Sequence, residues 1–249
     1  MTQAPRLYNS FAPLGNVVAM VELVMRLQNR TPGLPGMATY YGRSGLGKTT
    51  AAIFAGHKFQ AHHIELKSRW TPKHFCEQVM AELGLDTAKR LTVSKMIDAI
   101  SDQLARTRRP LLIDEADYLL RHDMVEIARD IYEGSGSPVI LIGEEHLPKK
   151  LEQWERVHGR MLDWVGAQPG TLDDVGHLAP LYAPGILIST DLKEAVLKAS
   201  HNSIRRISNN LAKVREFAAN SGLKTVGLAE WGDTPFAQVG APNGRNYSV

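Results

Sequence analysis

The sequence predicts an α/β fold in which a parallel sheet of five strands is flanked by helices and followed by a small all-helical subdomain. Three observations predict it. Short apolar runs alternate with segments of helical length as far as Pro169, a glycine-rich turn joins the first such run to a helix, and only helical patterns follow Pro169.

The α/β region begins with an apolar helical stripe over residues 15–29, which the turn-forming segment 31–36 ends. Strands are expected where short apolar runs lie between turn signals, and Thr71 followed by Pro72 is a typical helix start. Ser94 is expected to cap another helix. The expected strands are 37–41, 61–66, 111–113, 138–142 and 162–167, and the helices between them are 49–58, 72–84, 94–108, 123–133 and 148–158.

Beyond Pro169 the helical patterns cover residues 172–181, 191–200 and 204–220. The tail is rich in glycine, proline, asparagine and serine, which predicts a flexible segment. The expected organisation is an N-terminal arm (1–14), an α/β domain (15–169), a helical subdomain (170–231) and a tail (232–249).

The composition excludes several classes of protein. With 249 residues, 43% hydrophobic and 22% charged, the chain is neither wholly disordered nor fibrous. A net charge of +3 permits nucleic acid as a partner without requiring it. The single cysteine, Cys76, excludes a disulfide framework. No apolar run approaches the ~18–20 residues of a membrane span, so we expect a cytoplasmic protein without a membrane partner.

The glycine-rich turn carries the strongest functional motif. Residues 42–49 fit the phosphate-loop pattern G-x-x-x-x-G-K-[ST] in full. Its glycines let backbone N–H groups point at one anion, its lysine reaches the β- and γ-phosphates, and its threonine hydroxyl is a magnesium ligand. The residues expected to bind the nucleotide here are Gly42, Arg43, Ser44, Gly45, Leu46, Gly47, Lys48, Thr49 and Thr50.

An acid pair follows the third expected strand, which we expect to lie beside the first strand. Asp114 would hold Mg²⁺, largely through water, and Glu115 would orient and polarise the attacking water. Asp117 is either a further acid of the site or the cap of the next helix. Because a base-reading N-K-x-D motif is absent, ATP is favoured over GTP, and the acid pair favours hydrolysis over transfer to a metabolite.

These motifs resemble those of the AAA+ ATPases, and most closely the type that includes the phage Mu B transposition protein and the transposon target-selection ATPases. The cues for this type are residues 64–67 before Thr71, the sequence Leu-Leu-Ile-Asp-Glu-Ala-Asp over residues 111–117, and Asn-Ser-Ile-Arg-Arg-Ile over residues 202–207. The resemblance covers about residues 15–231 and implies a parallel α/β core with a helical lid.

The resemblance also implies roles for arginines. The family places a sensor 2 arginine in the lid, which touches the γ-phosphate of its own subunit's ATP; Arg205 matches it, with Arg206 as the neighbouring candidate. The family further supplies an arginine in trans, which stabilises charge on the transferred phosphoryl group. Arg156 and Arg160 both fall at that place, and the sequence does not decide between them.

Two features depart from the family pattern. Relatives commonly carry asparagine, threonine or serine at the sensor 1 position, where this chain has Glu144. Glu144 could still orient water, but a carboxylate there would repel the γ-phosphate unless it is screened, so slow hydrolysis is expected. The Mu relative also carries an additional N-terminal DNA-binding domain, for which the segment before the phosphate loop is too short, so DNA contacts are expected from the ATPase body.

Basic residues in two loops are the candidate DNA contacts. Lys67, Arg69 and Lys73 flank a tryptophan after the second expected strand, and Arg121 lies just beyond the acid pair. In contrast, His57, His62, His63 and His74 lack a metal-binding spacing, and strand alternation puts His62 and His63 on opposite faces.

The motifs thus predict an ATPase that binds ATP and Mg²⁺. The resemblance implies that ATP binds between subunits and that the protein assembles as rings or helical filaments on double-stranded DNA. The resemblance implies that it selects target DNA and activates a transposase. The alternatives are a helicase loader or replication initiator of the same superfamily, a secretion-assembly ATPase without a DNA partner, and a metabolite kinase.

Overall fold

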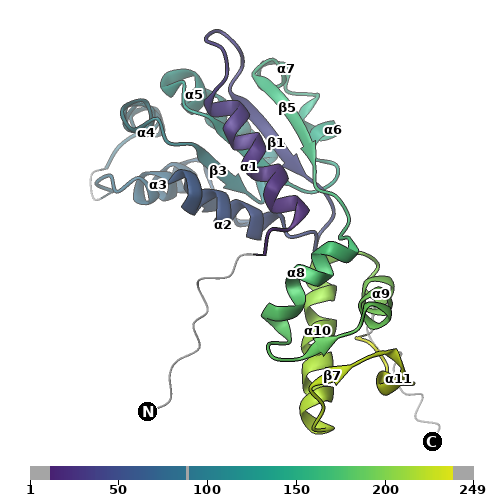
Figure 1. Cartoon of the computed structure of the whole chain (residues 1–249). Coiled ribbons are helices and arrows are strands. Elements are labelled where there is room, and N and C mark those ends of the chain that lie inside the picture. The colour runs from purple at the N-terminus through teal and green to yellow at the C-terminus, as the bar shows by residue number, and fades with distance from the viewer. Residues whose placement is uncertain (1–11, 88–89, 238–249) are drawn as a thin grey trace, which may run out of the picture. The chain divides into compact units, whose positions relative to one another are not determined.

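A computed structural model of the chain describes residues 12–87 and 90–237 (Figure 1). They divide into two compact units: Asn16–Gln168 form one, and Pro169 onward, together with the residues up to Gly15, form the other. Most of the expected N-terminal arm (1–14) and of the expected tail (232–249) lies outside the described residues.

The first unit is built on a five-stranded parallel sheet with the order β2-β3-β4-β1-β5. The strands are β1 (Met37–Tyr41), β2 (His62–Glu65), β3 (Leu111–Asp114), β4 (Val139–Gly143) and β5 (Met161–Gly166). The expectation that the acid-pair strand adjoins β1 is wrong, because β4 pairs with both β1 and β3 and separates them. The fold class itself is the one that the sequence predicts.

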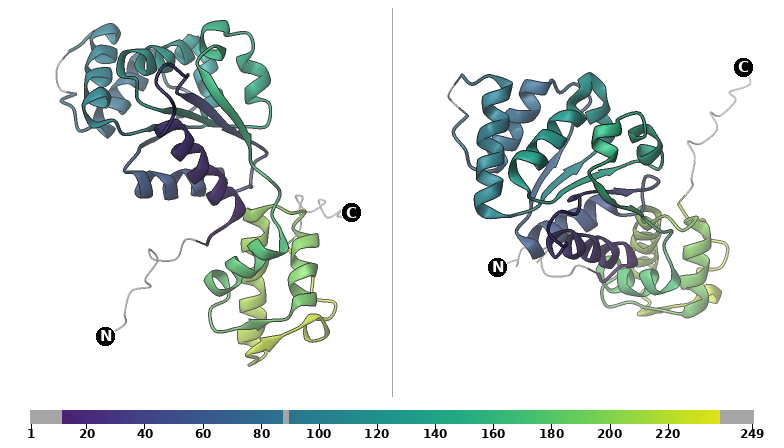
Figure 2. Two further views of the ribbon diagram at one scale, coloured as in Figure 1. Left: turned by 45° about the horizontal axis from the view of Figure 1, so that its top comes forward. Right: turned by 90° about the horizontal axis from the view of Figure 1, so that it is seen from above.

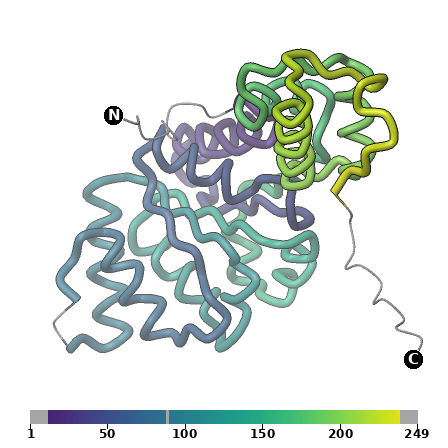
Figure 3. The backbone as a smooth tube through the Cα atoms, turned by 90° about the horizontal axis from the view of Figure 1, so that it is seen from below, coloured from purple at the N-terminus to yellow at the C-terminus, as the bar shows by residue number. Residues whose placement is uncertain are grey.

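Helices cover both faces of the sheet, as the view from above shows (Figure 2, right). One face carries α1 (Gly15–Gln28) and α2 (Lys48–Phe59); the other carries α3 (Pro72–Glu82), α4 (Val93–Thr107) and α5 (Met124–Ser135). Buried strand residues alternate between the two cores: Leu111 and Ile113 belong to the core under α3, α4 and α5, whereas the side chain of Leu112 faces the opposite layer. Figure 3 shows the course of the backbone from below, coloured along the chain.

Two local expectations are corrected, and one further segment is found. The helix expected over residues 148–158 is two short helices, α6 (Leu147–Leu151) and α7 (Glu155–His158), because Trp154 leaves the helical conformation with φ −106° and ψ 72°. Thr92, and not Ser94, caps α4, since its side chain accepts the Lys95 N–H. A 3₁₀ segment, η1 (Ala116–Asp123), follows the acid pair.

The second unit packs three main helices, α8 (Leu172–Tyr182), α9 (Thr190–Ala199) and α10 (Ile204–Asn220), and also contains the short helix α11 (Leu228–Trp231). The structure adds a short parallel strand pair, β6 (Leu187–Ile188) and β7 (Thr225–Val226). Strands of two residues are too short to give a recognisable pattern in the sequence. Within residues 12–87 and 90–237, the structure contains no helix with the length and apolar character needed to cross a bilayer.

Candidate nucleotide-binding site

The phosphate loop joins β1 to α2 and depends on glycine at two positions. Gly45 and Gly47 have φ of +87° and +85°, a left-handed conformation that side-chain-bearing residues avoid. Helix α2 then starts at Lys48 with no side-chain cap and no acidic residue in its first turn. Its first backbone N–H groups and the positive end of its dipole are therefore suited to a phosphate.

Lys48 lies folded against this loop. Its Nζ donates to the carbonyl oxygens of Gly42, at 2.7 Å, and Arg43, at 3.1 Å. Burial lowers the pKa of Lys48, and the negative charges of Asp114 and Glu115 oppose that shift. The ammonium is thus a cation among carboxylates at the carboxyl edge of the sheet.

Asn16, at the start of α1, braces the phosphate loop. Its Nδ2 donates to the carbonyl oxygens of Leu46, at 2.9 Å, and Gln168, at 2.8 Å, and its Oδ1 accepts the Gln168 N–H. Its own carbonyl accepts the hydroxyl of the buried Tyr40. Nothing in the local sequence marks Asn16 for this role, because its partners come from distant parts of the chain.

Asp114 ends β3 and is buried. Its Oδ1 accepts the Glu115 N–H at 2.8 Å, whereas its buried Oδ2 has no hydrogen-bond partner among the described residues. Burial raises the pKa of Asp114, but contacts with His63, Thr49 and the Glu115 N–H outweigh it, so the net pKa is lowered and the group is a carboxylate. A buried, unpartnered carboxylate oxygen near a threonine hydroxyl fits a magnesium ion held partly through water.

Glu115 has the left-handed backbone conformation, with φ 54° and ψ 38°, which is uncommon for a residue with a side chain. Burial and the adjacent charge of Asp114 raise the pKa of Glu115. A raised pKa makes a carboxylate a better proton acceptor near neutrality. Its position and its pKa both suit the activation of water.

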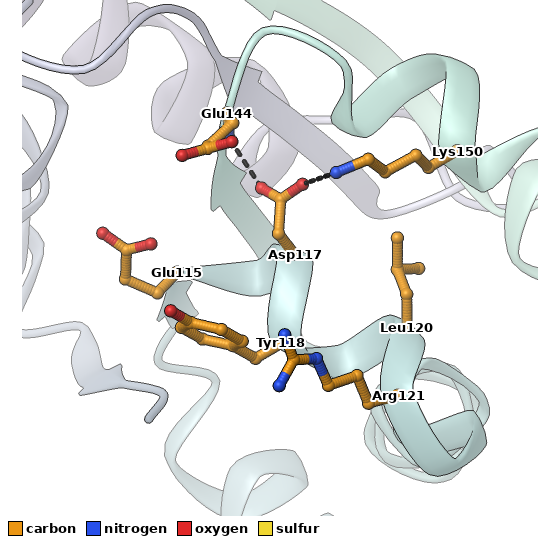
Figure 4. A pocket seen from close by; sticks show the side chains of 7 residues that line it. All are labelled: Glu115, Asp117, Tyr118, Leu120, Arg121, Glu144 and Lys150. Carbon is orange, nitrogen blue, oxygen red and sulfur yellow. Dashed lines mark hydrogen bonds and ion pairs between the residues drawn. The ribbon is translucent and has the colours of Figure 1, made fainter. Parts of the chain in front are cut away.

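A cavity of 330 Å³ opens beside Glu115 and is shown in Figure 4. Asp117 crosses it: one carboxylate oxygen accepts the Glu144 N–H at 2.6 Å and the other contacts Lys150 Nζ at 2.8 Å. Asp117 is therefore not the cap of the next helix; it joins η1 to the end of β4. A Cβ on Gly143 would lie 2.5 Å from the Asp117 carboxylate, so any larger residue there would displace this carboxylate.

Glu144 directly follows β4, and its predicted place at the sensor 1 position stays a prediction. Its side chain is exposed, and Figure 4 shows its carboxylate on the same side of the cavity as that of Glu115. The structure thus brings a third carboxylate to the edge of the sheet that carries Lys48 and the acid pair.

The structure brings the two predicted DNA-contact loops together. Arg121 donates to the carbonyl oxygen of Ser68 at 3.1 Å, and its guanidinium lies 5.1 Å from the centre of the Tyr118 ring. Lys67 and Arg69 are exposed beside Ser68. Lys73 is also exposed and forms a 3.8 Å ion pair with Glu77 on α3.

The two candidate trans arginines differ in their surroundings. Arg160 is held by Glu133, with its Nε 2.6 Å and its Nη2 2.5 Å from one carboxylate oxygen. Arg156 is exposed on α7 and has no ion-pair partner among residues 12–87 and 90–237. Arg205 and Arg206 lie in the first turn of α10, in the second unit, and their sensor 2 role stays a prediction.

His63 is a site residue that sequence reasoning missed. Its Nε2 lies 3.9 Å from Asp114 Oδ2, although its spacing from the other histidines gives no motif. Within the part of the chain that the structure describes, no group of three or more histidine, cysteine, aspartate or glutamate side chains is arranged to hold a metal ion. The signal that finds His63 is the pairing of β2 with β3, which a single sequence does not specify.

Comparisons with known proteins agree with this geometry. Residues 33–151 match the AAA domain family. The chain is 28% identical over 124 residues to the Mu-like prophage FluMu DNA transposition protein B of Haemophilus influenzae. This match covers 47% of this chain and 40% of that protein.

Among solved structures, the chain is similar to the Aeropyrum pernix ORC1 protein in complex with DNA, with a TM-score of 0.58 and 19% identity. The similarity covers 85% of this chain and 61% of the ORC1 chain. It is also similar to Cdc6p from Pyrobaculum aerophilum, with a TM-score of 0.61, 13% identity and coverage of 90% and 66%. At these identities the structural similarity shows the fold alone. The chain spans less than two thirds of the length of each of these three proteins. Together the matches confirm the predicted resemblance to the AAA+ ATPases of the Mu B type.

The Asn16 brace gives a testable prediction. Asn16→Ala leaves the Leu46 carbonyl and the Gln168 N–H without their partners, so the free energy of unfolding should fall by about 1–3 kcal/mol. The affinity for a fluorescent ATP analogue should fall as well, because the loop loses its support. Urea unfolding and fluorescence titration measure the two effects. Val18→Ala, at an exposed position of the same helix, should change neither. Unchanged nucleotide affinity in Asn16→Ala would show that the brace does not serve the loop.

Proposed function

We propose that this AAA+ ATPase of the Mu B type binds and slowly hydrolyses ATP with Mg²⁺, assembles as rings or helical filaments on double-stranded DNA, selects target DNA and activates a transposase. The observation that carries the proposal is one arrangement at the carboxyl edge of the sheet: Lys48 in a phosphate loop, near the buried Asp114 and the raised-pKa Glu115.

Each residue of this edge has a defined task. The N–H groups of the phosphate loop and Lys48 bind the β- and γ-phosphates, which places the γ-phosphate toward Glu115. Thr49 and Asp114 would hold Mg²⁺, which supplies neutralisation of the charge on the phosphates. Glu115 accepts a proton from the attacking water, for which its raised pKa suits it.

Glu144 is the reason why this proposal includes slow hydrolysis of ATP. Its carboxylate adds negative charge close to where the γ-phosphate would lie, and Asp117 fixes the backbone that carries it. Slow hydrolysis suits a protein that remains assembled on DNA for a limited time and then releases it.

The DNA-contact surface in this proposal consists of Lys67, Arg69, Lys73 and Arg121, defined here as the basic loop surface. Arg121 ties its loop to Ser68, so the cations form one surface. Exposed lysines and arginines without base-reading geometry contact the phosphate backbone, so binding should be independent of sequence and sensitive to salt.

The arginine that acts in trans in this proposal is Arg156. Arg160 is engaged with Glu133, which also contacts Arg129. Moving Arg160 into a neighbour's site would break its ion pair with Glu133. Arg156 is exposed, and no ion pair holds it among the described residues.

The target-selection and transposase roles rest on the name of the Mu-like relative, which describes that protein as a DNA transposition protein. A cytoplasmic location, in a bacterial host if the chain is encoded by a phage, belongs to the same proposal.

ATP-dependent assembly on DNA is the central prediction. Electron microscopy of the protein with ATP and duplex DNA should show rings or filaments. Lys48→Ala should abolish nucleotide binding and with it these assemblies. Glu115→Gln, which cannot activate water, should give assemblies that persist after competitor DNA is added.

Protein that stays monomeric with saturating ATP and DNA would contradict the proposal. ATP-dependent assembly without any DNA effect at low salt would favour a secretion-assembly ATPase. Copurification with a replicative helicase in place of a transposase would favour a helicase loader.

The basic loop surface can be tested by reversing charge. Lys67→Glu with Arg69→Glu should weaken duplex binding and reduce the slope of log affinity against log salt by up to about 1.8, since each lost phosphate contact is worth about 0.9. ATP affinity should be unchanged. Fluorescence anisotropy over a series of salt concentrations measures both the affinity and the slope.

The matched control is Arg106→Glu with Arg109→Glu, which makes the same change in net charge. These exposed arginines precede β3 and so lie near the amino ends of the strands, away from the basic loop surface. If both double variants weaken DNA binding equally, the effect is one of net charge and the basic loop surface is wrong.

The trans role of Arg156 predicts a loss of hydrolysis with binding retained. Arg156→Ala should lower the DNA-stimulated rate of ATP hydrolysis by about 100-fold or more, with ATP affinity unchanged. Arg160→Ala should retain hydrolysis and lose only the about 0–1 kcal/mol of stability that an exposed ion pair contributes.

Mixing separates action in trans from action within one subunit. Glu115→Gln protein binds ATP without hydrolysing it but still supplies Arg156, so mixing it with Arg156→Ala protein should restore part of the activity. A mixture as inactive as its components would refute action in trans, and a complete loss of activity in Arg160→Ala alone would reverse the assignment.

A further inference from the structure

We propose that His63 is a positioning residue that orients the Asp114 carboxylate for Mg²⁺; this inference rests on the proposed ATP-dependent function. It concerns a side chain for which neither the sequence motifs nor the comparisons with known proteins give a role.

The pairing of β2 with β3 puts the two side chains together. His63 is in register with Leu112 and Glu65 with Asp114 in this parallel pair, so His63 sits on the strand neighbouring Asp114, two positions back. The Nε2 of His63 and the Oδ2 of Asp114 are 3.9 Å apart, and the side chains are 22% and 3% exposed. They therefore face each other in a space from which water is largely excluded.

The two facing atoms are chemically complementary. Both His63 Nε2 and Asp114 Oδ2 are buried, and neither has a hydrogen-bond partner among the described residues. A buried polar atom without a partner costs about 1–3 kcal/mol, whereas an imidazole N–H opposite a carboxylate oxygen satisfies both groups. A shift of about 1 Å brings them within hydrogen-bond distance.

The other carboxylate oxygen is already fixed. Asp114 Oδ1 accepts the backbone N–H of Glu115 at 2.8 Å. With Oδ1 held by the backbone and Oδ2 faced by His63, the plane of the carboxylate has a defined direction relative to Thr49. Partners that orient a metal-binding carboxylate in this way typically change metal affinity 10–100-fold when removed.

The chain supplies a matched control in the adjacent histidine. His62 points to the opposite side of β2, where its Nδ1 lies 3.7 Å from the Glu82 carboxylate on α3. Its side chain is 11% exposed, and the charged groups that act on it are Glu82 and Arg109, outside the acid pair. A substitution at His62 therefore reports on the stability of β2 without touching Asp114.

The experiment measures nucleotide binding as a function of Mg²⁺. A fluorescent ATP analogue is titrated into the full chain in EDTA and at a series of Mg²⁺ concentrations, and urea unfolding is recorded for each variant. His63→Leu removes the ring nitrogens at similar volume, His63→Gln keeps an N–H donor, and His62→Leu is the control.

His63→Leu should raise the Mg²⁺ concentration for half-maximal binding about tenfold or more and leave affinity in EDTA unchanged. His63→Gln should recover part of that shift, and His62→Leu should show the wild-type Mg²⁺ dependence. A purely structural role for His63 would change the unfolding curve without moving the Mg²⁺ midpoint.

An unchanged Mg²⁺ midpoint in His63→Leu, or a shift of equal size in His62→Leu, would overturn the inference. If His63→Leu does not fold, His63→Phe removes the donor in its place and is judged by the same midpoint. A wild-type protein that binds no ATP at any Mg²⁺ concentration would instead defeat the proposed function, so the two failures are distinguishable.

Discussion

Negative charges gather around one ammonium group at the carboxyl edge of the parallel sheet. The order and direction of the strands place these charged groups together. The phosphate loop follows β1, the acid pair follows β3 and Glu144 follows β4, so strand polarity alone delivers them to one edge. Burial lowers the pKa of Lys48, and the charges of Asp114, Glu115 and Glu144 oppose that lowering. Because like charges repel at such an edge, its geometry depends on fixed backbone contacts and cannot rely on packing of the side chains alone.

Those contacts explain which parts of the site can be predicted from the sequence. The phosphate loop and the acid pair each lie within a few consecutive residues, so composition and spacing identify them. Asn16 and Gln168 are 152 positions apart, and His63 and Asp114 meet only because β2 pairs with β3. The order of the sheet is similarly non-local: β4 takes the place next to β1 that we expected β3 to occupy. Local signals also fail where two residues compete for one role, as Thr92 and Ser94 do at the start of α4.

Asp117 connects two segments at this edge of the sheet and has its own charge neutralised there. Its own charge is balanced by Lys150, while its second oxygen holds the N–H of Glu144. The residue that follows β4 is thereby tied to the 3₁₀ segment η1, which begins directly after Glu115 and also carries Arg121 of the basic loop surface. The acid pair and Arg121 are thus connected through the chain itself, and the end of β4 is joined to them by the hydrogen bond of Asp117.

The same edge explains why hydrolysis would depend on a neighbour. Glu115 and Glu144 present two carboxylates to one side of the cavity, with Lys48 as the nearby cation, and a triphosphate adds further negative charge. A second cation is needed before charge can develop on the transferred phosphoryl group, and Lys150 is already committed to Asp117. Within this proposal an exposed guanidinium on α7 of an adjacent copy supplies it. In that proposal the carboxylate of Glu144 would have two effects on the control of hydrolysis. It would keep an isolated subunit slow, and it would attract the cation that arrives on assembly.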